Sequence, residues 1–131
     1  MHRLGELERR VMDILWDSMD QPLSGRQVAD ELPDRAYTTV LTILERLRRK
    51  KLVRRESKDR LHVFSALASR ESYMATLMLE PLGGARDRKA VLVRFAETVS
   101  PKEARVLREA LDDLVRGPKQ ARNGKKRAGA G

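Results

Sequence analysis

The chain has 131 residues, with 28 Lys and Arg against 19 Asp and Glu and a formal net charge of +9. This length allows one or two small domains and excludes a large enzyme fold. The absence of Cys excludes disulfide bonds and thiolate metal sites, and the aromatic content of 4% argues against base stacking on single strands as the main binding mode.

The positive charge is concentrated in one internal segment and in the tail. Residues 46–60 hold nine Lys and Arg against two acidic residues, and residues 117–131 hold five against none. A sequence pI of about 10.5 is typical of nucleic-acid-binding domains, although a basic tail can produce the same value. The tail consists mainly of Gly, Ala and cations without periodicity, so we expect 117–131 to be disordered.

The first two predicted elements are helices. An apolar stripe with helical spacing covers the first 18 residues, and Trp16 borders it as a core or subunit-contact residue rather than a ligand-stacking group. Ser24 and Gln27 form a capping box that opens a short second helix, and Pro33 ends that helix.

The stretch from Asp34 to Leu52 predicts a longer third helix with two distinct faces. Asp34 is its expected N-cap, and cations crowd its last turn, where the helix dipole favours them. The apolar face comprises Val40, Ile43, Leu44 and Leu47. The opposite, polar face comprises Thr38, Thr42, Glu45, Arg46 and Arg49.

After this helix the pattern changes to period two. Residues 52–56 and 61–65 predict two strands, with 57–60 as the turn between them. A basic hairpin directly behind two helices joined by a tight turn is the wing of a winged helix-turn-helix. The predicted fold is therefore mainly α with a small β-hairpin wing, followed by a helical region.

The remaining elements are predicted to be helices that form a dimer interface. Ser69 can cap a helix that runs to Pro81, and Ser100 to Glu103 form a second capping box with Pro at the first helical position. We expect 1–68 to bind DNA and 69–116 to dimerise. The helices of 69–116 carry more apolar side chains than three short helices can bury among themselves, and a symmetric dimer would cover them. The apolar residues assigned to the interface are Leu77, Phe95, Leu107, Leu111 and Leu114.

A polar helix face with hydroxyls at its start and arginines behind suits a helix that enters the major groove of duplex DNA. We assign contacts with bases and phosphates to Thr38, Thr39 and Thr42, and a guanine or phosphate contact to Arg46. We assign phosphate contacts to Arg49 and Lys50 and, at the wing tip, to Lys58 and Arg60. The alternatives are an ordinary solvated helix face, or a winged helix that binds an acidic protein partner.

The residues from Ala36 to Thr42, followed by Leu44, Arg46-Leu47 and Lys50 to Val53, resemble the penicillinase-repressor and methicillin-resistance-regulator family. The opening Leu4 to Glu8 and the Leu15-Trp16 pair are also similar to that family. The resemblance covers residues 4 to about 115 and is strongest up to 67.

This resemblance implies a dimeric winged-helix repressor of two-fold symmetric operators at antibiotic-resistance genes, with Thr38, Thr39, Thr42 and Arg46 on DNA. A related branch controls copper genes through C-terminal cysteines, which this chain lacks. In the antibiotic branch, a sensor-linked protease cuts the dimerisation region at an Asn-Phe bond. The corresponding bond here is Arg94-Phe95, so the Asn is replaced. The family often has Gly where the recognition helix ends, and Lys51 must either adopt a positive φ there or end the helix differently.

Other functions lack a supporting motif. The two histidines, His2 and His62, stand alone, so we expect no metal and no cofactor. No phosphate-binding loop or nucleophile motif indicates an enzyme. No apolar run approaches the roughly 18–20 residues of a membrane span, and the expected location is cytoplasmic, without membrane insertion.

Overall fold

The computed structural model describes residues 3–117. The chain divides into two compact units, one ending at Gly83 and the other beginning at Gly84. Beyond Gly117, the tail predicted to be disordered lies outside the described residues. None of the described helices is long and apolar enough to cross a membrane.

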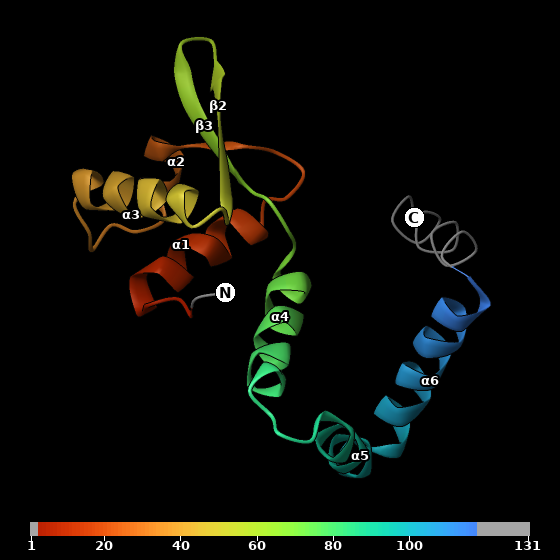
Figure 1. Cartoon of the computed structure of the whole chain (residues 1–131). Helices are drawn as coiled ribbons and strands as arrows, with labels where there is room; N and C mark the ends of the chain where they lie inside the picture. Colours follow the sequence, from red (N-terminus) through yellow and green to blue (C-terminus); the bar gives the residue numbers. More distant parts are fainter. Residues whose placement is uncertain (1–2, 118–131) are drawn as a thin grey trace. The chain divides into compact units, whose positions relative to one another are not determined.

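The first unit has the element order of a winged helix, which confirms the predicted fold class (Figure 1). The hairpin of two strands projects from a cluster of three helices, and a fourth helix follows the hairpin. The elements are α1 (Glu6–Trp16), β1 (Leu23–Ser24), α2 (Gly25–Asp30), α3 (Tyr37–Arg49), β2 (Val53–Lys58), β3 (Leu61–Ala66) and α4 (Arg70–Gly83).

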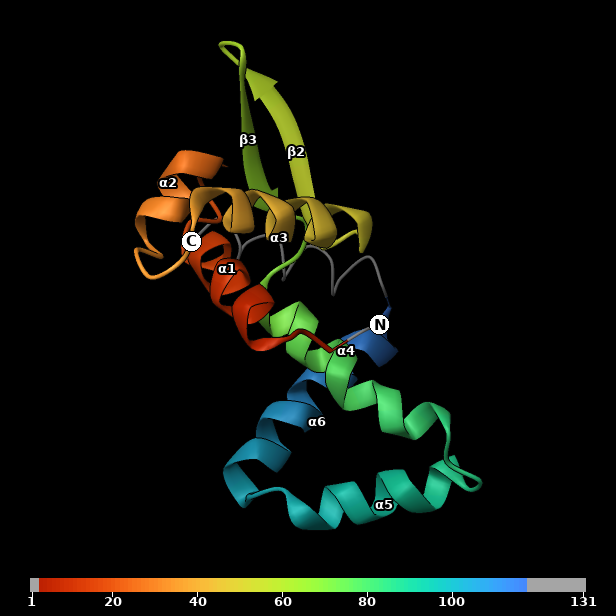
Figure 2. The same cartoon turned by 90° about the vertical axis from the view of Figure 1, so that its left-hand side faces the viewer.

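The core of this unit lies between α1, α2 and α3 and the base of the hairpin. The apolar faces predicted for α1 and α3 are the buried faces, and Figure 2 shows α3 crossing in front of α1. Trp16 is only 6% exposed, which confirms its predicted place in the core. Each fully buried aliphatic side chain stabilises the fold by about 1.5–3 kcal/mol. Such side chains include Val11, Leu15, Val28, Val40, Leu44 and Leu47.

Both predicted capping boxes form. The Ser24 hydroxyl accepts a hydrogen bond from the Gln27 N–H at 3.1 Å, and the Gln27 amide oxygen accepts from the Ser24 N–H at 2.8 Å. Ser100 and Glu103 make the same pair of bonds at 3.1 and 3.0 Å, with Pro101 as the first residue of the helix. Local sequence therefore defines where these two helices begin.

The predicted N-cap of the third helix was wrong. Ala36 occupies the N-cap position of α3 and makes no side-chain cap. Asp34 instead accepts two hydrogen bonds from the Arg10 guanidinium on α1, at 2.9 and 3.0 Å. This pairing lowers the pKa of the Asp34 carboxyl to about 2. The carboxylate is therefore used for a contact with α1 rather than for capping.

The end of α3 shows how the chain manages without a glycine. Lys51 has φ of 64° and donates its N–H to the Arg48 carbonyl at 3.0 Å, and the Leu52 N–H bonds to the Leu47 carbonyl at 3.0 Å. These two bonds constitute a Schellman motif, whose left-handed residue is usually Gly. Of the two alternatives left open at Lys51, the structure shows the positive φ.

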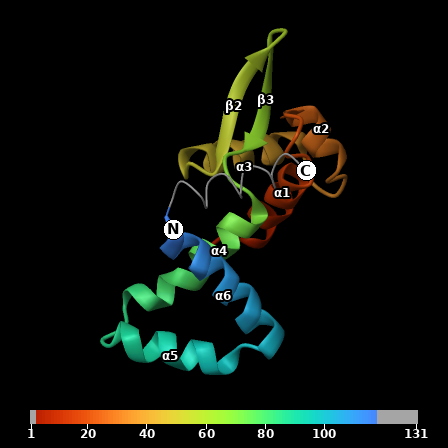
Figure 3. The same ribbon diagram turned by 90° about the vertical axis from the view of Figure 1, so that its right-hand side faces the viewer.

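The three-stranded sheet has the order β1-β3-β2, and all its pairs are antiparallel. Lys58 pairs with Leu61, so the turn contains only Asp59 and Arg60, with φ of 50° and 68°. The predicted four-residue turn over 57–60 was therefore too long. Two positive φ values match a type I′ turn, which follows the twist of the strands. Figure 3 shows the hairpin from the side opposite to Figure 2.

The helix α4 packs on the core through Tyr73 and Leu77. Ser69 caps it as predicted, accepting a hydrogen bond from the Ser72 N–H at 3.1 Å. The helix passes Pro81 and ends at Gly83, so the predicted end at Pro81 was two residues early. A proline in the last turn forfeits a single backbone donor, which is a smaller loss than in a helix interior.

The second unit contains α5 (Arg88–Thr98) and α6 (Pro101–Arg116). Asp87 caps α5 by accepting a hydrogen bond from the Ala90 N–H at 3.0 Å. Neither helix has a buried residue in the single chain. Their apolar side chains therefore lack a core within the described part of this unit.

Candidate nucleic-acid interface

The exposed face of α3 carries the side chains predicted to read DNA. Thr38, Thr39, Thr42, Arg46 and Arg49 are all exposed, because Val40, Ile43, Leu44 and Leu47 hold the opposite face in the core. The structure thus brings the five predicted residues of this helix together on one accessible surface. Their roles in binding stay predictions.

The threonine hydroxyls on this face are not all equivalent. The Thr42 hydroxyl donates to the Thr38 carbonyl at 2.9 Å, one turn earlier in the helix. This bond fixes the Thr42 rotamer and leaves its oxygen lone pairs and methyl group available. Thr42 therefore offers an acceptor and an apolar contact, which match the N4 amino group of cytosine and the methyl group of thymine.

The cations on α3 differ in how far they are already paired. Arg46 makes no ion pair with any other described residue, and the Arg49 side chain is 79% exposed, with only a 3.9 Å approach to Glu45. Lys50, in contrast, donates to the Glu8 carboxylate at 2.7 Å and is largely covered. Arg46 and Arg49 can reach a phosphate or base directly, whereas Lys50 would first have to leave Glu8.

Glu45 is the one acidic side chain within this basic helix face, and it connects α3 to the wing. It forms a hydrogen-bonded ion pair with Arg48 and lies 3.6 Å from Arg55 on β2 and 3.9 Å from Arg49. The Arg48 hydrogen bond, with the neighbouring positive charges, holds the pKa of Glu45 below its ordinary value. A carboxylate that is ionised throughout the neutral range therefore orients cations from two elements.

The tip of the wing presents a second basic group. Lys58, Arg60 and Leu61 are exposed, and Arg60 holds the second left-handed position of the turn. A residue with a Cβ is disfavoured at that φ by about 1–2 kcal/mol relative to Gly. An arginine kept there at a conformational cost is consistent with a role for its charge in binding.

Sequence reasoning missed three cations near this surface. Arg26 on α2 stacks over the Tyr37 ring, with 4.1 Å from the guanidinium carbon to the ring centroid, and Arg55 reaches the Glu45 carboxylate. Arg54 is exposed on the same strand. The two strand arginines lay within the charge-rich 46–60 segment, but no local pattern indicated the Arg26 stack.

A groove of about 410 Å³ lies between α2, α3 and the wing, and both apolar and basic side chains line it. Gly25 allows α2 to lie close to α3 here, since a Cβ at Gly25 would approach Leu41 to 2.6 Å. Residues of α3 and Arg60 of the wing turn both line this groove, so it extends the basic surface of α3 toward the wing tip. Its lining includes Arg26, Tyr37, Leu41, Glu45, Arg55 and Arg60.

The described residues contain no cluster of His, Asp and Glu able to hold a metal ion. His62 is exposed on β3, outside the core. The chemistry of the surface is therefore that of hydroxyl, guanidinium and ammonium groups, which recognise phosphates and base edges.

The family model and the curated relatives identify the same family. A family model described as Penicillinase repressor matches residues 4–113. The chain is 46% identical over 121 residues to "Transcriptional regulator BlaI" of Mycobacterium tuberculosis, an alignment that covers 88% of this chain and 87% of that protein.

Among solved structures, the chain is similar in fold to the MepR-DNA complex of S. aureus. The TM-score is 0.50 at 19% sequence identity, and the alignment covers 74% of this chain and 82% of that chain. At this identity the likeness concerns the fold.

Proposed function

The chain belongs to the penicillinase-repressor family of DNA-binding transcriptional repressors, and on that premise we propose that it acts as a homodimer on two-fold symmetric operator DNA. The observation that carries the proposal is the exposed face of α3, where hydroxyl side chains precede two accessible arginines. A winged helix inserts such a face into the major groove, and its wing lies along the adjacent backbone.

The proposed roles follow from accessibility. Arg46 is exposed and makes no ion pair with another described residue, and it contacts a guanine edge or a phosphate. Thr38, Thr39 and Thr42 contact base edges or methyl groups. Arg49, Lys58 and Arg60 contact phosphates, and Lys50 joins them by exchanging Glu8 for a phosphate oxygen.

The dimer is supported by the apolar surface of the second unit. Phe95, Leu107, Leu111 and Leu114 are 40, 38, 57 and 62% exposed in the single chain. An exposed apolar stripe of this kind indicates a protein contact, and a second copy supplies a self-complementary partner. Leu77 differs from the other predicted interface residues because it packs against the core of its own first unit.

We propose that the repressor controls β-lactam-resistance or cell-wall-stress genes, since the matching family is that of penicillinase repressors. A sensor-linked protease would then cleave the repressor when the antibiotic is present.

We propose that repression ends by a cut within α5, between about Val91 and Ala96, with Arg94-Phe95 as the candidate bond. The Arg94 side chain is 86% exposed and lies 3.8 Å from Glu97, whereas Phe95 is assigned to the subunit contact. Cleavage there would separate α5 into two short pieces that cannot remain helical alone. Loss of the dimer would uncouple the two half-sites and weaken operator binding without altering α3.

A footprint of the full-length protein on the DNA flanking its own gene tests this function. Two protected half-sites with two-fold symmetry, centred about one or more helical turns apart, are expected. Sedimentation of the same sample should show a dimer. Uniform protection without a preferred site, or a monomer bound to one half-site, would contradict the proposal.

A further inference from the structure

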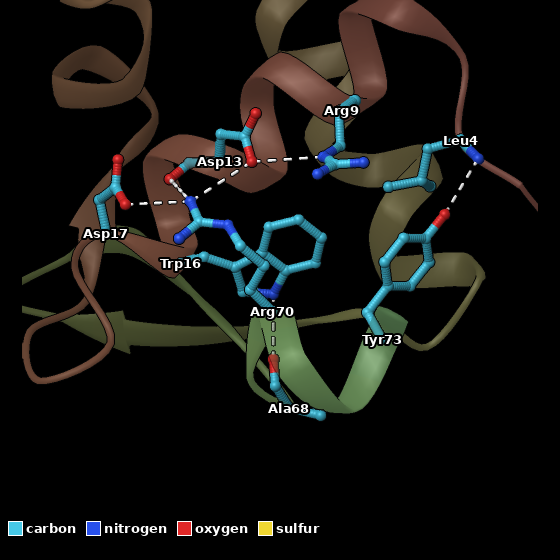
Figure 4. Close-up of polar contacts among 8 residues, drawn as sticks. All are labelled: Leu4, Arg9, Asp13, Trp16, Asp17, Ala68, Arg70 and Tyr73. Carbon is cyan, nitrogen blue, oxygen red and sulfur yellow. Dashed lines mark hydrogen bonds and ion pairs between the residues drawn. The ribbon is translucent and has the colours of Figure 1, made fainter. Parts of the chain in front are cut away.

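A cluster of side chains fastens the start of α4 to α1, more than fifty residues away in sequence (Figure 4). The Arg70 guanidinium donates to the Asp17 carboxylate at 3.0 Å and to the Asp13 carboxylate at 3.3 Å. Its carbon also lies 5.4 Å from the centroid of the Trp16 ring. Arg70 therefore makes charged and stacking contacts with three residues of one helix end.

Two further hydrogen bonds support this contact on either side of Arg70. The Trp16 ring N–H donates to the Ala68 carbonyl at 3.1 Å, just before α4 begins. The Leu4 N–H donates to the Tyr73 hydroxyl at 3.3 Å, one turn into the helix, and the Tyr73 and Trp16 rings lie 5.3 Å apart. We call this set, Leu4, Asp13, Trp16, Asp17, Ala68, Arg70 and Tyr73, the α1–α4 latch.

The latch occupies only one side of α4. Tyr73 and Leu77 pack on the core, whereas Met74, Met78 and Leu79 are 49, 64 and 60% exposed. These side chains make an exposed apolar face on α4 itself. Subunit contacts are therefore expected to begin on α4 itself, directly after the latch.

We propose that Arg70 is a positioning residue that, through the α1–α4 latch, sets which spacing of operator half-sites the dimer accepts. The inference rests on the proposed dimeric function and adds a determinant of its specificity. The latch fixes α4 to α1, and α1 packs directly on the recognition helix α3. A subunit contact that begins on α4 thus reaches α3 through two rigid contacts.

DNA geometry makes such rigidity measurable. Each added base pair moves one half-site by about 3.4 Å and rotates it by about 35° around the axis. A rigid dimer loses one of its two contacts after such a change, and with it the gain from linked binding. A dimer without the latch contacts can reorient its two winged-helix units and keep both half-site contacts.

The test uses full-length protein and duplexes selected by the wild type from a random pool, each remade with one to three base pairs inserted or removed at the centre. For the wild type, we expect affinity to fall at least about tenfold after a change of one or two base pairs. For Arg70→Ala, we expect weaker binding at the native spacing but a loss of no more than about threefold across the series. Affinity for an isolated half-site should be unchanged.

Two further variants separate positioning from folding and charge. The Asp13→Asn, Asp17→Asn double variant keeps Arg70 but removes its carboxylate partners, and it should show the same broad spacing profile as Arg70→Ala. Lys102→Ala removes one exposed positive charge from α6 and should keep the narrow wild-type profile. Thermal melting followed by circular dichroism verifies that each variant is folded before its profile is recorded.

The outcomes distinguish this inference from the function on which it rests. Paired half-sites for the wild type, together with a wild-type spacing profile for both latch variants, would overturn the role of Arg70 alone. Selection of single, unpaired half-sites by the wild type would overturn the proposed dimeric function and this inference with it. A broad profile for both latch variants and a narrow one for Lys102→Ala would establish the role.

Discussion

Lys51 shows how a single residue can carry conformational strain at the end of a helix, here α3. Its φ of 64° closes α3 with two hydrogen bonds that normally involve a glycine. Lys51→Gly should therefore raise the free energy of unfolding by about 0.5–1 kcal/mol, as measured by urea denaturation.

The neighbouring lysine provides the control for this prediction. Lys50 has an ordinary φ of −77° and pairs with Glu8, so Lys50→Gly should lower the free energy of unfolding. Equal effects of the two substitutions would contradict the Schellman closure at Lys51.

The Glu8–Lys50 pair predicts a pH dependence of stability. Burial raises the pKa of Glu8, but hydrogen bonds from Lys50 and from the Gly5 N–H outweigh it and hold the pKa below its ordinary value of 4.5. Because the folded pKa is the lower one, the stabilisation is fully present above about pH 4.5 and disappears as the pH falls through the folded pKa.

Glu8→Gln should therefore cost about 1–2 kcal/mol of unfolding free energy at pH 7 and much less near pH 3. Urea titrations of both proteins at the two pH values measure the difference. A constant difference between wild type and variant at both pH values would rule out the proposed ionic contribution of Glu8.

At the scale of elements, Glu45 couples the recognition helix to the wing. It contacts arginines on α3 and on β2, and it places one negative charge within the surface that we propose contacts phosphates. Glu45→Gln should raise affinity for non-specific duplex severalfold, because a charge that repels phosphates is lost. The ratio of specific to non-specific affinity should fall, because the arginines are no longer held in place.

Glu56→Gln is the matched control, since it removes the same charge from an exposed position on β2. This variant should also raise non-specific affinity but should leave the affinity ratio closer to the wild-type value. The same fall in ratio for both variants, measured by fluorescence anisotropy, would mean that Glu45 acts through its charge alone.

The helices, the wing and the capping boxes could be predicted from the sequence because their signals are local. Apolar spacing predicted α1 and α3. The Ser24 and Ser100 capping boxes, each a motif of four consecutive residues, predicted the starts of α2 and α6. The α3 face could be predicted for the same reason, since burial of one face of a helix exposes the other.

The features that were missed depend on residues far apart in the chain. Asp34 bonds Arg10, 24 positions away, instead of capping α3, and Arg70 bonds Asp17, 53 positions away. The two residues of β1 form a strand only because β3 lies beside them. No periodicity in the sequence records such pairs, so the α1–α4 latch and the true role of Asp34 required the fold.

At the scale of the whole molecule, the compact unit that includes the latch extends through Gly83. A fragment of residues 1–83 should therefore fold, sediment as a monomer and bind a half-site weakly. Its affinity should depend less steeply on salt than that of the full-length protein, because one subunit neutralises about half as many phosphates as two.

The slope of log affinity against log salt concentration, measured for fragment and full-length protein on the same operator, tests this prediction. Equal slopes, or a fragment that sediments as a dimer, would mean that the contacts of the first unit hold the dimer together without α5 and α6.

The central claim is that the exposed face of α3 reads duplex DNA, and binding by Arg46→Ala tests it most directly. Arg46 is exposed and unpaired among the described residues, so its loss should leave the fold intact. Affinity for the selected operator should fall by roughly 1–3 kcal/mol per subunit, while affinity for unrelated duplex falls less. Lys58→Ala at the wing tip should weaken both alike. Unchanged affinity of Arg46→Ala for both DNAs would contradict the assignment of α3 as the recognition helix.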